Sequence, residues 1–169
     1  PAALALKPDL VSILIGANDL VGPHPVIPAL AAEVESAVRA VRRAGADVLL
    51  VTTFLPRRAA ARVFARRFAA YNVELRRIAH AHGAILLDLE AVAEIGELPV
   101  WADDLVHLRS RGHRLVAYRA AEALGVPDAA ALLGLDEALH ADDDEPRPGW
   151  ITRDALPWVW RRLRGRTAG

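Results

Sequence analysis

The sequence predicts an α/β domain built on a parallel sheet, because short apolar runs alternate with helical patterns along the chain. Three runs rich in Val, Ile and Leu occur at Leu10–Gly16, Asp47–Phe54 and Ala84–Leu89. They show little alternation of apolar and polar residues, which is typical of strands covered on both faces. Between them, apolar residues three and four apart predict helices over Val26–Ala44 and Arg57–His82. Such alternation of strand and helix indicates a doubly wound sheet.

Glycines mark the ends of both predicted helices. Gly45 follows the first helical pattern and Gly83 the second, and glycine is common where a helix ends in the left-handed conformation. After the third strand, a loop leads to a further helix from about Ser110 to Leu124, for which Ser110 is the expected N-cap. A short helix is predicted over Asp128–His140.

The first apolar run suits a central strand, because LVSILIG is apolar on both faces. No earlier segment of this chain is available to pair beside it. The chain also contains no Met, even at position 1. We therefore expect that amino-terminal strands precede Pro1 and that the chain is a piece of a longer protein.

Length and composition narrow the class of protein. The 169 residues suit one domain, and the 53% hydrophobic content is enough for a sizeable core, which excludes wholesale disorder. The 21 basic and 21 acidic residues balance, which argues against a nucleic-acid partner. The absence of Cys excludes a disulfide scaffold, a thiolate metal site and a cysteine nucleophile.

A first group of candidate functional residues lies in GAND, just beyond the carboxyl end of the first predicted strand. It contains Gly16, Asn18 and Asp19. In open α/β sheets, ligands bind at this edge, and an Asn amide there can donate hydrogen bonds to a negative charge that develops on a substrate oxygen. The same residue types also dominate ordinary turns, so this segment alone leaves a plain turn open.

A second group lies in the loop after the third predicted strand, where Asp104 and His107 are three residues apart. A neutral imidazole can accept a proton from a nucleophile, and a carboxylate can fix its tautomer. This spacing lets both side chains face one pocket. Because Asp-x-x-His alone is a weak signal, a surface Asp and a helix-capping His are the alternative.

The two groups occur together with further short motifs. DLVH at 104–107 is followed after five residues by a second His, and the stretch from Tyr71 to Leu89 reads YNVELRRIAHAHGAILLDL. In order and spacing, GAND and DLVH resemble blocks III and V of the SGNH hydrolases, also called the GDSL lipase/esterase family. The Tyr71–Leu89 stretch is similar to that family's Tyr-Asn, Leu-Arg, Ala, His-Gly and Leu-Asp-Leu run. The resemblance covers roughly Lys7 to Val126.

This resemblance implies a flavodoxin-like, three-layer α/β/α fold and hydrolysis of a small-molecule ester, with no metal or organic cofactor. By family role, Asn18 is expected to be an oxyanion-hole donor and His107 the general base, with Asp104 as its orienting partner. Gly16 is expected to allow the turn that presents Asn18. Asp103 is a second candidate for the role of Asp104, although the family spacing favours Asp104.

The chain also departs from the family pattern. Neither the Gly-Asp-Ser block of the nucleophile nor the block with the oxyanion Gly is present. Of the three serines, Ser12 is expected mid-strand with a buried hydroxyl, Ser36 near the polar side of a helix, and Ser110 at a helix start, too close to His107 to reach it. We therefore expect the nucleophile to lie outside this chain and the chain alone to be inactive.

Another departure follows the predicted base. The family often has Pro-Asn after its His, whereas this chain has Leu108 and Arg109. This change leaves His107 in place and is expected to reshape the pocket mouth. No metal site is expected from the remaining histidines, which are scattered or point in different directions: His24, His80, His82, His113 and His140.

The chain divides by composition into three parts. Residues 1–126 form the carboxy-terminal part of the hydrolase domain, 127–149 a short helix and an acidic linker, and 150–169 a basic, Trp-rich helix. The last part has five arginines and one aspartate, with Trp158 and Trp160. We favour a helix packed on the body over an interfacial membrane helix or a partner-docking segment.

The function predicted from these observations is a serine ester hydrolase of the SGNH type. One alternative is a non-catalytic relative that binds carbohydrate or lipid, and another is an interaction protein that works through its basic tail. The opening PAALALKPDL lacks the pattern of a signal peptide. The cytoplasm is slightly favoured on that ground, although the natural N-terminus is not visible, and the oligomeric state stays open.

Overall fold

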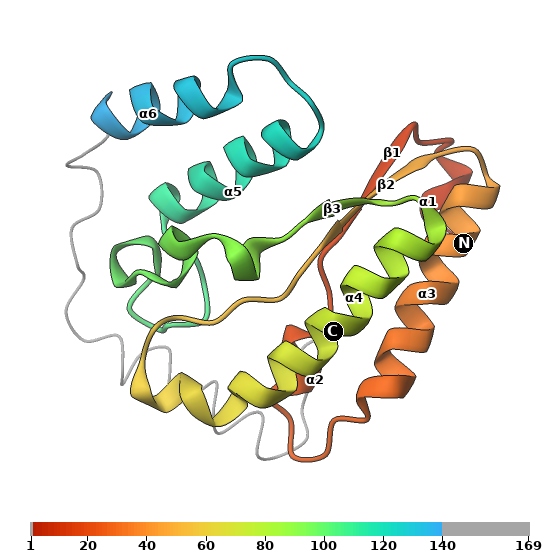
Figure 1. Cartoon of the computed structure of the whole chain (residues 1–169), viewed down its shortest axis with the longest axis horizontal. Helices are drawn as coiled ribbons and strands as arrows, with labels where there is room; N and C mark the ends of the chain where they lie inside the picture. Colours follow the sequence, from red (N-terminus) through yellow and green to blue (C-terminus); the bar gives the residue numbers. More distant parts are fainter. Residues whose placement is uncertain (1, 140–169) are drawn as a thin grey trace.

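The computed structural model describes residues 2–139, which fold into three layers (Figure 1). No helix in this range combines the length and apolar character that crossing a bilayer requires. In chain order the elements are α1 (Ala2–Ala5), β1 (Leu10–Ile13), α2 (Ala17–Leu20), α3 (Ile27–Arg43), β2 (Asp47–Val51), η1 (Ala59–Phe64), α4 (Ala65–His82), β3 (Ile85–Leu87), η2 (Leu89–Ala91), η3 (Ala93–Gly96), η4 (Leu98–Val100), α5 (Ser110–Ala123) and α6 (Ala129–Leu139).

The middle layer is a parallel sheet with the strand order β1-β2-β3. Leu10 of β1 lies opposite Asp47 of β2, and Leu49 of β2 opposite Ile85 of β3. The strands confirm the three predicted runs, although each is shorter than its run. Because all three are parallel, their carboxyl ends meet at one edge of the sheet, where the chain continues into α2, η1 and η2.

Helices α3 and α4 cover one face of the sheet (Figure 1). On α3 the buried residues are Ala31, Val34, Val38 and Val41, spaced three and four apart. This spacing confirms the apolar stripe expected for that helix. Val26, predicted to begin the stripe, precedes the helix and is exposed.

The helix predicted from Arg57 begins later than expected. Residues 59–64 form the 3₁₀ helix η1, and the α-helix α4 starts at Ala65. A 3₁₀ helix has about three residues per turn, so the four-residue steps of the predicted stripe do not hold there, and Val63 is exposed. The end at Gly83 is confirmed, because this glycine has a φ of 60°.

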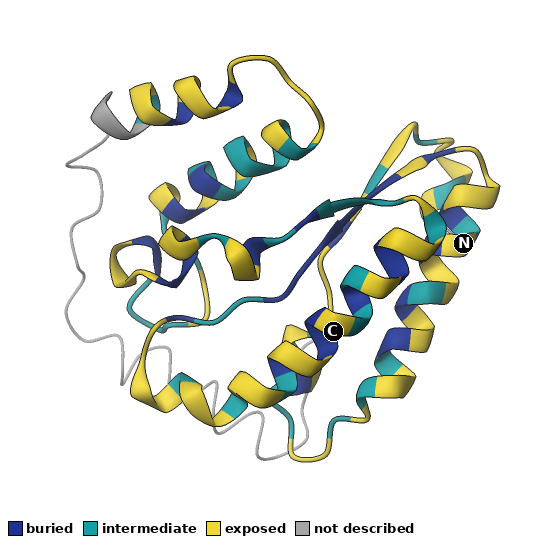
Figure 2. Cartoon of the chain, viewed as in Figure 1, coloured by how far each residue is buried: buried dark blue, intermediate teal, exposed yellow. Residues whose placement is uncertain are grey.

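Helix α5 packs on the opposite face of the sheet. Leu49, Val51 and Leu87 are buried there, with Val116 and Ala120 of α5 packed against them. Figure 2 shows the buried residues concentrated in the sheet and on the helix faces turned toward it. The result is the predicted three-layer α/β/α arrangement.

The short helix predicted over Asp128–His140 is confirmed by α6, which packs against α5. Leu133 is buried in this contact, and Arg114 Nε lies 2.7 Å from Asp136 Oδ2. The predicted acidic linker and the Trp-rich helix at 150–169 lie outside the described residues. The division of the chain into three parts therefore stays a prediction.

Within residues 2–139, strand β1 pairs only with β2 and lies at an edge of the sheet, which agrees with the expectation that no earlier segment of this chain pairs beside it. The central position expected for this strand stays a prediction. Val11 and Ile13 face the core under α3 and α4, whereas Ser12 is exposed. Beyond the strand, Leu14 and Ile15 are 48% and 53% exposed. The expectation of a buried Ser12 hydroxyl is wrong, because no described element packs on that face of β1.

Candidate active site

The predicted base and its partner lie in a loop between η4 and α5, and the two arms of this loop pair with each other. Trp101 and Leu108 form an isolated antiparallel bridge. The amide of Ala102 donates to the carbonyl oxygen of His107 at 2.8 Å, and the amide of Arg109 to that of Val100 at 2.9 Å. This pairing fixes both ends of the segment that contains Asp104.

The carboxylate of Asp104 folds this segment and orients His107. Its Oδ1 accepts hydrogen bonds from the amides of Val106 and His107, both at 2.9 Å, and its Oδ2 lies 2.6 Å from His107 Nδ1. An ionised carboxylate only accepts, so we assign the imidazole proton to Nδ1 and leave Nε2 as the acceptor. The His107 side chain is 72% exposed, so Nε2 is accessible to a reacting group.

Asp104 is held in its charged form. Its partial burial disfavours ionisation, but hydrogen bonds from the His107 side chain and from two backbone amides outweigh this and lower the pKa of Asp104 below its ordinary value of 3.8. A charged Asp104 keeps the proton on Nδ1 of His107. The pair therefore has the geometry and charge that a general base requires.

Asp103 does not compete with Asp104 for the imidazole. Its Oδ1 lies 2.6 Å from Nη2 of Arg109, and Nε of Arg109 donates to the carbonyl oxygen of Trp101 at 2.7 Å. The structure thus gives the two neighbouring carboxylates different partners. From the sequence, Arg109 was expected only as a departure from the family pattern, and its contacts with the loop were not predicted.

Asn18 lies in the one-turn helix α2, directly after β1 at the carboxyl edge of the sheet. Its side chain is exposed and forms no hydrogen bond with any described residue. The amide is therefore available to donate to a ligand. No hydrogen bond joins Asn18 to Asp104 or His107 within residues 2–139, and the two groups lie on different segments, α2 and the loop before α5.

Glycine is the only residue type that fits at position 16 without strain. Its φ is 99°, and a Cβ built there would lie 2.6 Å from Cε1 of Tyr71. The Tyr71 hydroxyl donates to the carbonyl oxygen of Ile15 at 3.4 Å. Burial, together with the negative charges of Asp19 and Glu33, raises the pKa of Tyr71 to about 12, so this hydroxyl keeps its proton.

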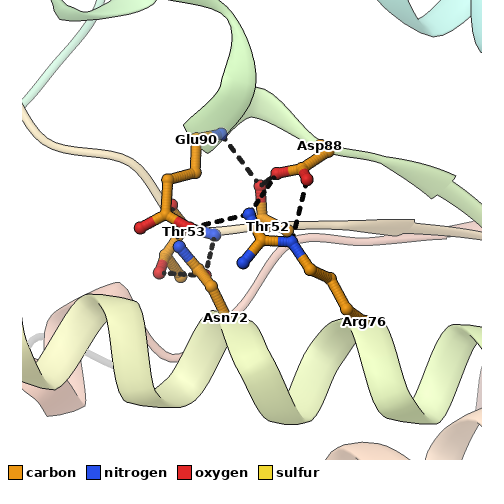
Figure 3. A network of polar contacts seen from close by, with 6 residues as sticks. All are labelled: Thr52, Thr53, Asn72, Arg76, Asp88 and Glu90. Carbon is orange, nitrogen blue, oxygen red and sulfur yellow. Dashed lines mark hydrogen bonds and ion pairs between the residues drawn. The ribbon is translucent and has the colours of Figure 1, made fainter.

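The Asn of the family-like Tyr-Asn pair anchors the end of β2 (Figure 3). Asn72 of α4 is fully buried, and its Oδ1 accepts hydrogen bonds from the amide and the hydroxyl of Thr53 at 2.9 and 2.8 Å. Its Nδ2 donates to the carbonyl oxygen of Thr53 at 2.8 Å. Asn72 thus satisfies the backbone where the chain leaves the sheet.

The Leu-Arg and Leu-Asp-Leu motifs tie α4 to the end of β3. Arg76 donates through Nε and Nη2 to both carboxylate oxygens of Asp88, each at 2.8 Å, and Nη2 also donates to Glu90 Oε2 at 2.7 Å. Thr52 completes the network, because its hydroxyl donates to Asp88 at 3.1 Å and accepts from the amide of Glu90 (Figure 3). These motif residues therefore shape the edge of the sheet that bears the site.

The three serines lie on elements other than the loop that holds His107. Ser12 is in the middle of β1, and Ser36 is on the exposed side of α3. Ser110 is the first residue of α5, and the N-cap position belongs to Arg109, so the predicted capping role of Ser110 is wrong. No serine hydroxyl in the described range forms a hydrogen bond with His107.

Of the other described histidines, His113 lies in the first turn of α5, where its amide donates to the carbonyl oxygen of Arg109 at 3.0 Å. His140 lies outside the described residues. His82 Nε2 is 2.7 Å from Glu35 Oε1 of α3, and His80 is exposed. In the part of the chain that the structure describes, no three His, Asp or Glu side chains gather as a potential metal site.

Comparison with protein families adds to this geometry. The model of the GDSL-like lipase/acylhydrolase family matches residues 1–115, a range that contains both GAND and the Asp104–His107 pair. The chain belongs to this family. No curated protein sequence matches it.

Solved structures share the fold of this GDSL-like family member. A variant of Axe2, an acetyl-xylooligosaccharide esterase from Geobacillus, is 24% identical with a TM-score of 0.63, covering 72% of this chain and 62% of that chain. A second Axe2 variant, named as an acetyl xylan esterase from Geobacillus stearothermophilus, is 23% identical with a TM-score of 0.63, covering 73% and 62%. LAE5, an α/β hydrolase from the metagenome of Lake Arreo, Spain, is 24% identical with a TM-score of 0.61 and the same coverage. The chain thus spans 62% of the length of each of these proteins, and likeness at this identity establishes the fold alone.

Proposed function

We propose that the protein is an SGNH-type serine ester hydrolase that acts on small-molecule esters, with Asp104 and His107 as two members of its catalytic triad. The observation that carries this proposal is the 2.6 Å contact between Asp104 Oδ2 and His107 Nδ1, with the rest of the imidazole exposed. Membership of the GDSL-like lipase/acylhydrolase family supports acyl-ester chemistry.

In this proposal His107 moves a proton in both half-reactions. A serine hydroxyl attacks the ester carbonyl and forms a new C–O bond while Nε2 of His107 accepts the hydroxyl proton. The imidazolium, stabilised by Asp104, then gives that proton to the departing alcohol as the ester C–O bond breaks. Water repeats the sequence on the acyl-enzyme and releases the acid.

Asn18 is proposed as a donor to the oxyanion that forms when the carbonyl is attacked. Support comes from its exposed amide at the carboxyl edge of the sheet, which has no partner within residues 2–139. Preorganised donors of this kind are among the largest contributors to acyl transfer. Gly16 supports this role indirectly, because its left-handed backbone starts the turn that carries Asn18.

The serine itself is proposed to come from a segment outside these 169 residues. The positions of Ser12, Ser36 and Ser110 favour this assignment. Within residues 2–139 the outer side of β1 is unpaired, which leaves room for further strands in the sheet. A serine that follows such a strand would arrive at the same carboxyl edge as Asn18.

The test is hydrolysis of p-nitrophenyl acetate by the full-length protein, an acetyl ester chosen because the Axe2 structures are named as acetyl esterases. We expect His107→Ala to abolish turnover, and Asp104→Asn to lower kcat by about 10⁴-fold because an amide favours the wrong imidazole tautomer. His80→Ala, which removes an exposed His on α4, is the matched control and should change nothing. Undiminished hydrolysis in His107→Ala would overturn the proposal, and a folded full-length protein without hydrolysis would favour a non-catalytic binding domain.

A further inference from the structure

We infer that the ion pair between Arg109 and Asp103 holds the loop in the shape that presents Asp104 to His107, so that Arg109 is a positioning residue for the reaction. This inference rests on the proposed function. It concerns the residue at which this chain departs from the family's pattern after His107.

The loop contains a backbone conformation that needs external support. Leu105, between Asp104 and Val106, has a φ of 55°, which is unfavourable for a residue with a branched side chain. This turn lets the Asp104 carboxylate reach the amides of Val106 and His107. A strained residue of this kind persists only where surrounding contacts determine its conformation.

Arg109 makes three contacts that hold the loop from one side. Its amide donates to Val100, its Nε to the carbonyl oxygen of Trp101 at 2.7 Å, and its Nη2 to Asp103 Oδ1 at 2.6 Å. The Arg109 and Asp103 side chains are only 17% and 18% exposed, so water screens their attraction weakly. One residue thus joins the closing arm of the loop to three positions on the opening arm.

The opening arm is itself fixed to the core. Trp101 is buried, its indole Nε1 donates to the carbonyl oxygen of Ile95 at 2.7 Å, and its ring centroid lies 5.6 Å from that of Phe54. Arg109 is therefore attached to a segment that the core holds in place. Through this attachment it fixes where the segment from Asp103 to His107 can lie.

The pair also removes a competitor from the site. Asp103 is the sequence neighbour of Asp104, and a second free carboxylate there could accept the Nδ1 proton of His107 in a different orientation. Arg109 engages this carboxylate and neutralises its charge. A lysine cannot replace it fully, because a single ammonium lacks the planar fork that reaches Trp101 and Asp103 together.

The experiment compares Arg109→Gln, Arg109→Lys and Asp103→Asn in the full-length protein. For p-nitrophenyl acetate we expect kcat to fall by about 10- to 100-fold in Arg109→Gln, with KM changed less than about twofold, because misplacing a catalytic group slows the chemical step. Arg109→Lys should recover part of the loss. The double variant with Asp103→Asn and Arg109→Gln should have a kcat only slightly below that of Arg109→Gln alone, because both changes break the same pair. The control is Arg119→Gln, which removes an arginine of α5 that pairs with Glu94 and Glu122.

A second readout is independent of turnover. In wild type, ¹H NMR should detect the hydrogen-bonded Nδ1 proton of His107. In Arg109→Gln and Arg109→Lys this signal should weaken or the proton should exchange faster with water. Arg109→Lys should keep the thermal unfolding transition of the wild type. Wild-type kcat in Arg109→Gln together with an unchanged proton signal would overturn the inference. If the wild type hydrolyses no ester, the proposed function fails, and the proton signal alone still decides whether Arg109 positions His107.

Discussion

Single residues in this site combine tasks that sequence spacing does not reveal. Asp104 accepts two backbone amides as well as the imidazole, so the same carboxylate folds the loop and orients the base. Gly16 likewise starts the turn before Asn18 and leaves room for the ring of Tyr71. Substitution at either position therefore affects local structure and the site together.

Gly16→Ala is expected to destabilise the fold by about 3 kcal/mol, because it adds both a left-handed alanine and a clash with Tyr71. Gly45→Ala is the matched control, since Gly45 has a φ of 86° but nothing within 4 Å of a built Cβ. That variant should lose only about 1 kcal/mol, the backbone part of the effect. Urea unfolding measures both, and equal losses would show that Tyr71 does not constrain Gly16.

At the scale of elements, α4 organises the carboxyl edge of the sheet. Asn72 and Arg76 are four residues apart, so they lie on the same face of this helix and reach the ends of β2 and β3. Asn72 binds the backbone after β2, and Arg76 binds Asp88 after β3. The family-like stretch from Tyr71 to Leu89 therefore stabilises the carboxyl edge of the sheet.

This network predicts a specific acid sensitivity. Burial disfavours the charge of Asp88, but hydrogen bonds from Arg76 and Thr52 outweigh it and lower the pKa of Asp88 below 3.8. As the pH falls below about 3.9, the unfolded chain binds the proton first. The free energy of unfolding therefore decreases until the native carboxyl is also protonated, and the stabilisation is fully present only above the unfolded pKa.

Asp88→Asn should remove this contribution. We expect lower stability than wild type at pH 7 and a shallower decline between about pH 4.5 and pH 3, by at most roughly 1.4 kcal/mol per pH unit for one proton. Urea unfolding at several pH values measures both effects. Asp9→Asn, which changes an exposed carboxylate without a side-chain hydrogen bond in the described range, should leave the decline unchanged. Parallel curves for Asp88→Asn and wild type would contradict the role given to Asp88.

Across the whole molecule, the sequence predicted the structural features that depend on local residue patterns. The alternation of apolar runs and helical stripes predicted the parallel sheet and its covering helices. The resemblance to the SGNH hydrolases, with the three-residue spacing, predicted the contact of Asp104 with His107. The exposure of Ser12 was not predicted, because burial depends on which elements pack against a strand. The contact of Thr53 with Asn72 was missed because the partners are 19 positions apart.

The parts of the site also differ in whether a local pattern predicted them or only the folded chain shows them. Arg109 was visible only as a substitution in a motif, because its partners are fixed by the folding of the loop. Asn18 and the Asp104–His107 pair are each explained by their own segment, and the proposed serine has no counterpart among the described contacts. We therefore propose that this chain provides the base, its orienting acid and an oxyanion donor to a serine outside it.

Labelling of the full-length protein with a fluorophosphonate tests this claim most directly. A serine activated by His107 attacks the phosphorus, fluoride leaves, and the label marks that serine for peptide mass spectrometry. We predict one labelled serine outside the 169 residues, with labelling lost in His107→Ala and retained in His80→Ala. A label on Ser12, Ser36 or Ser110, or labelling that survives His107→Ala, would contradict the account.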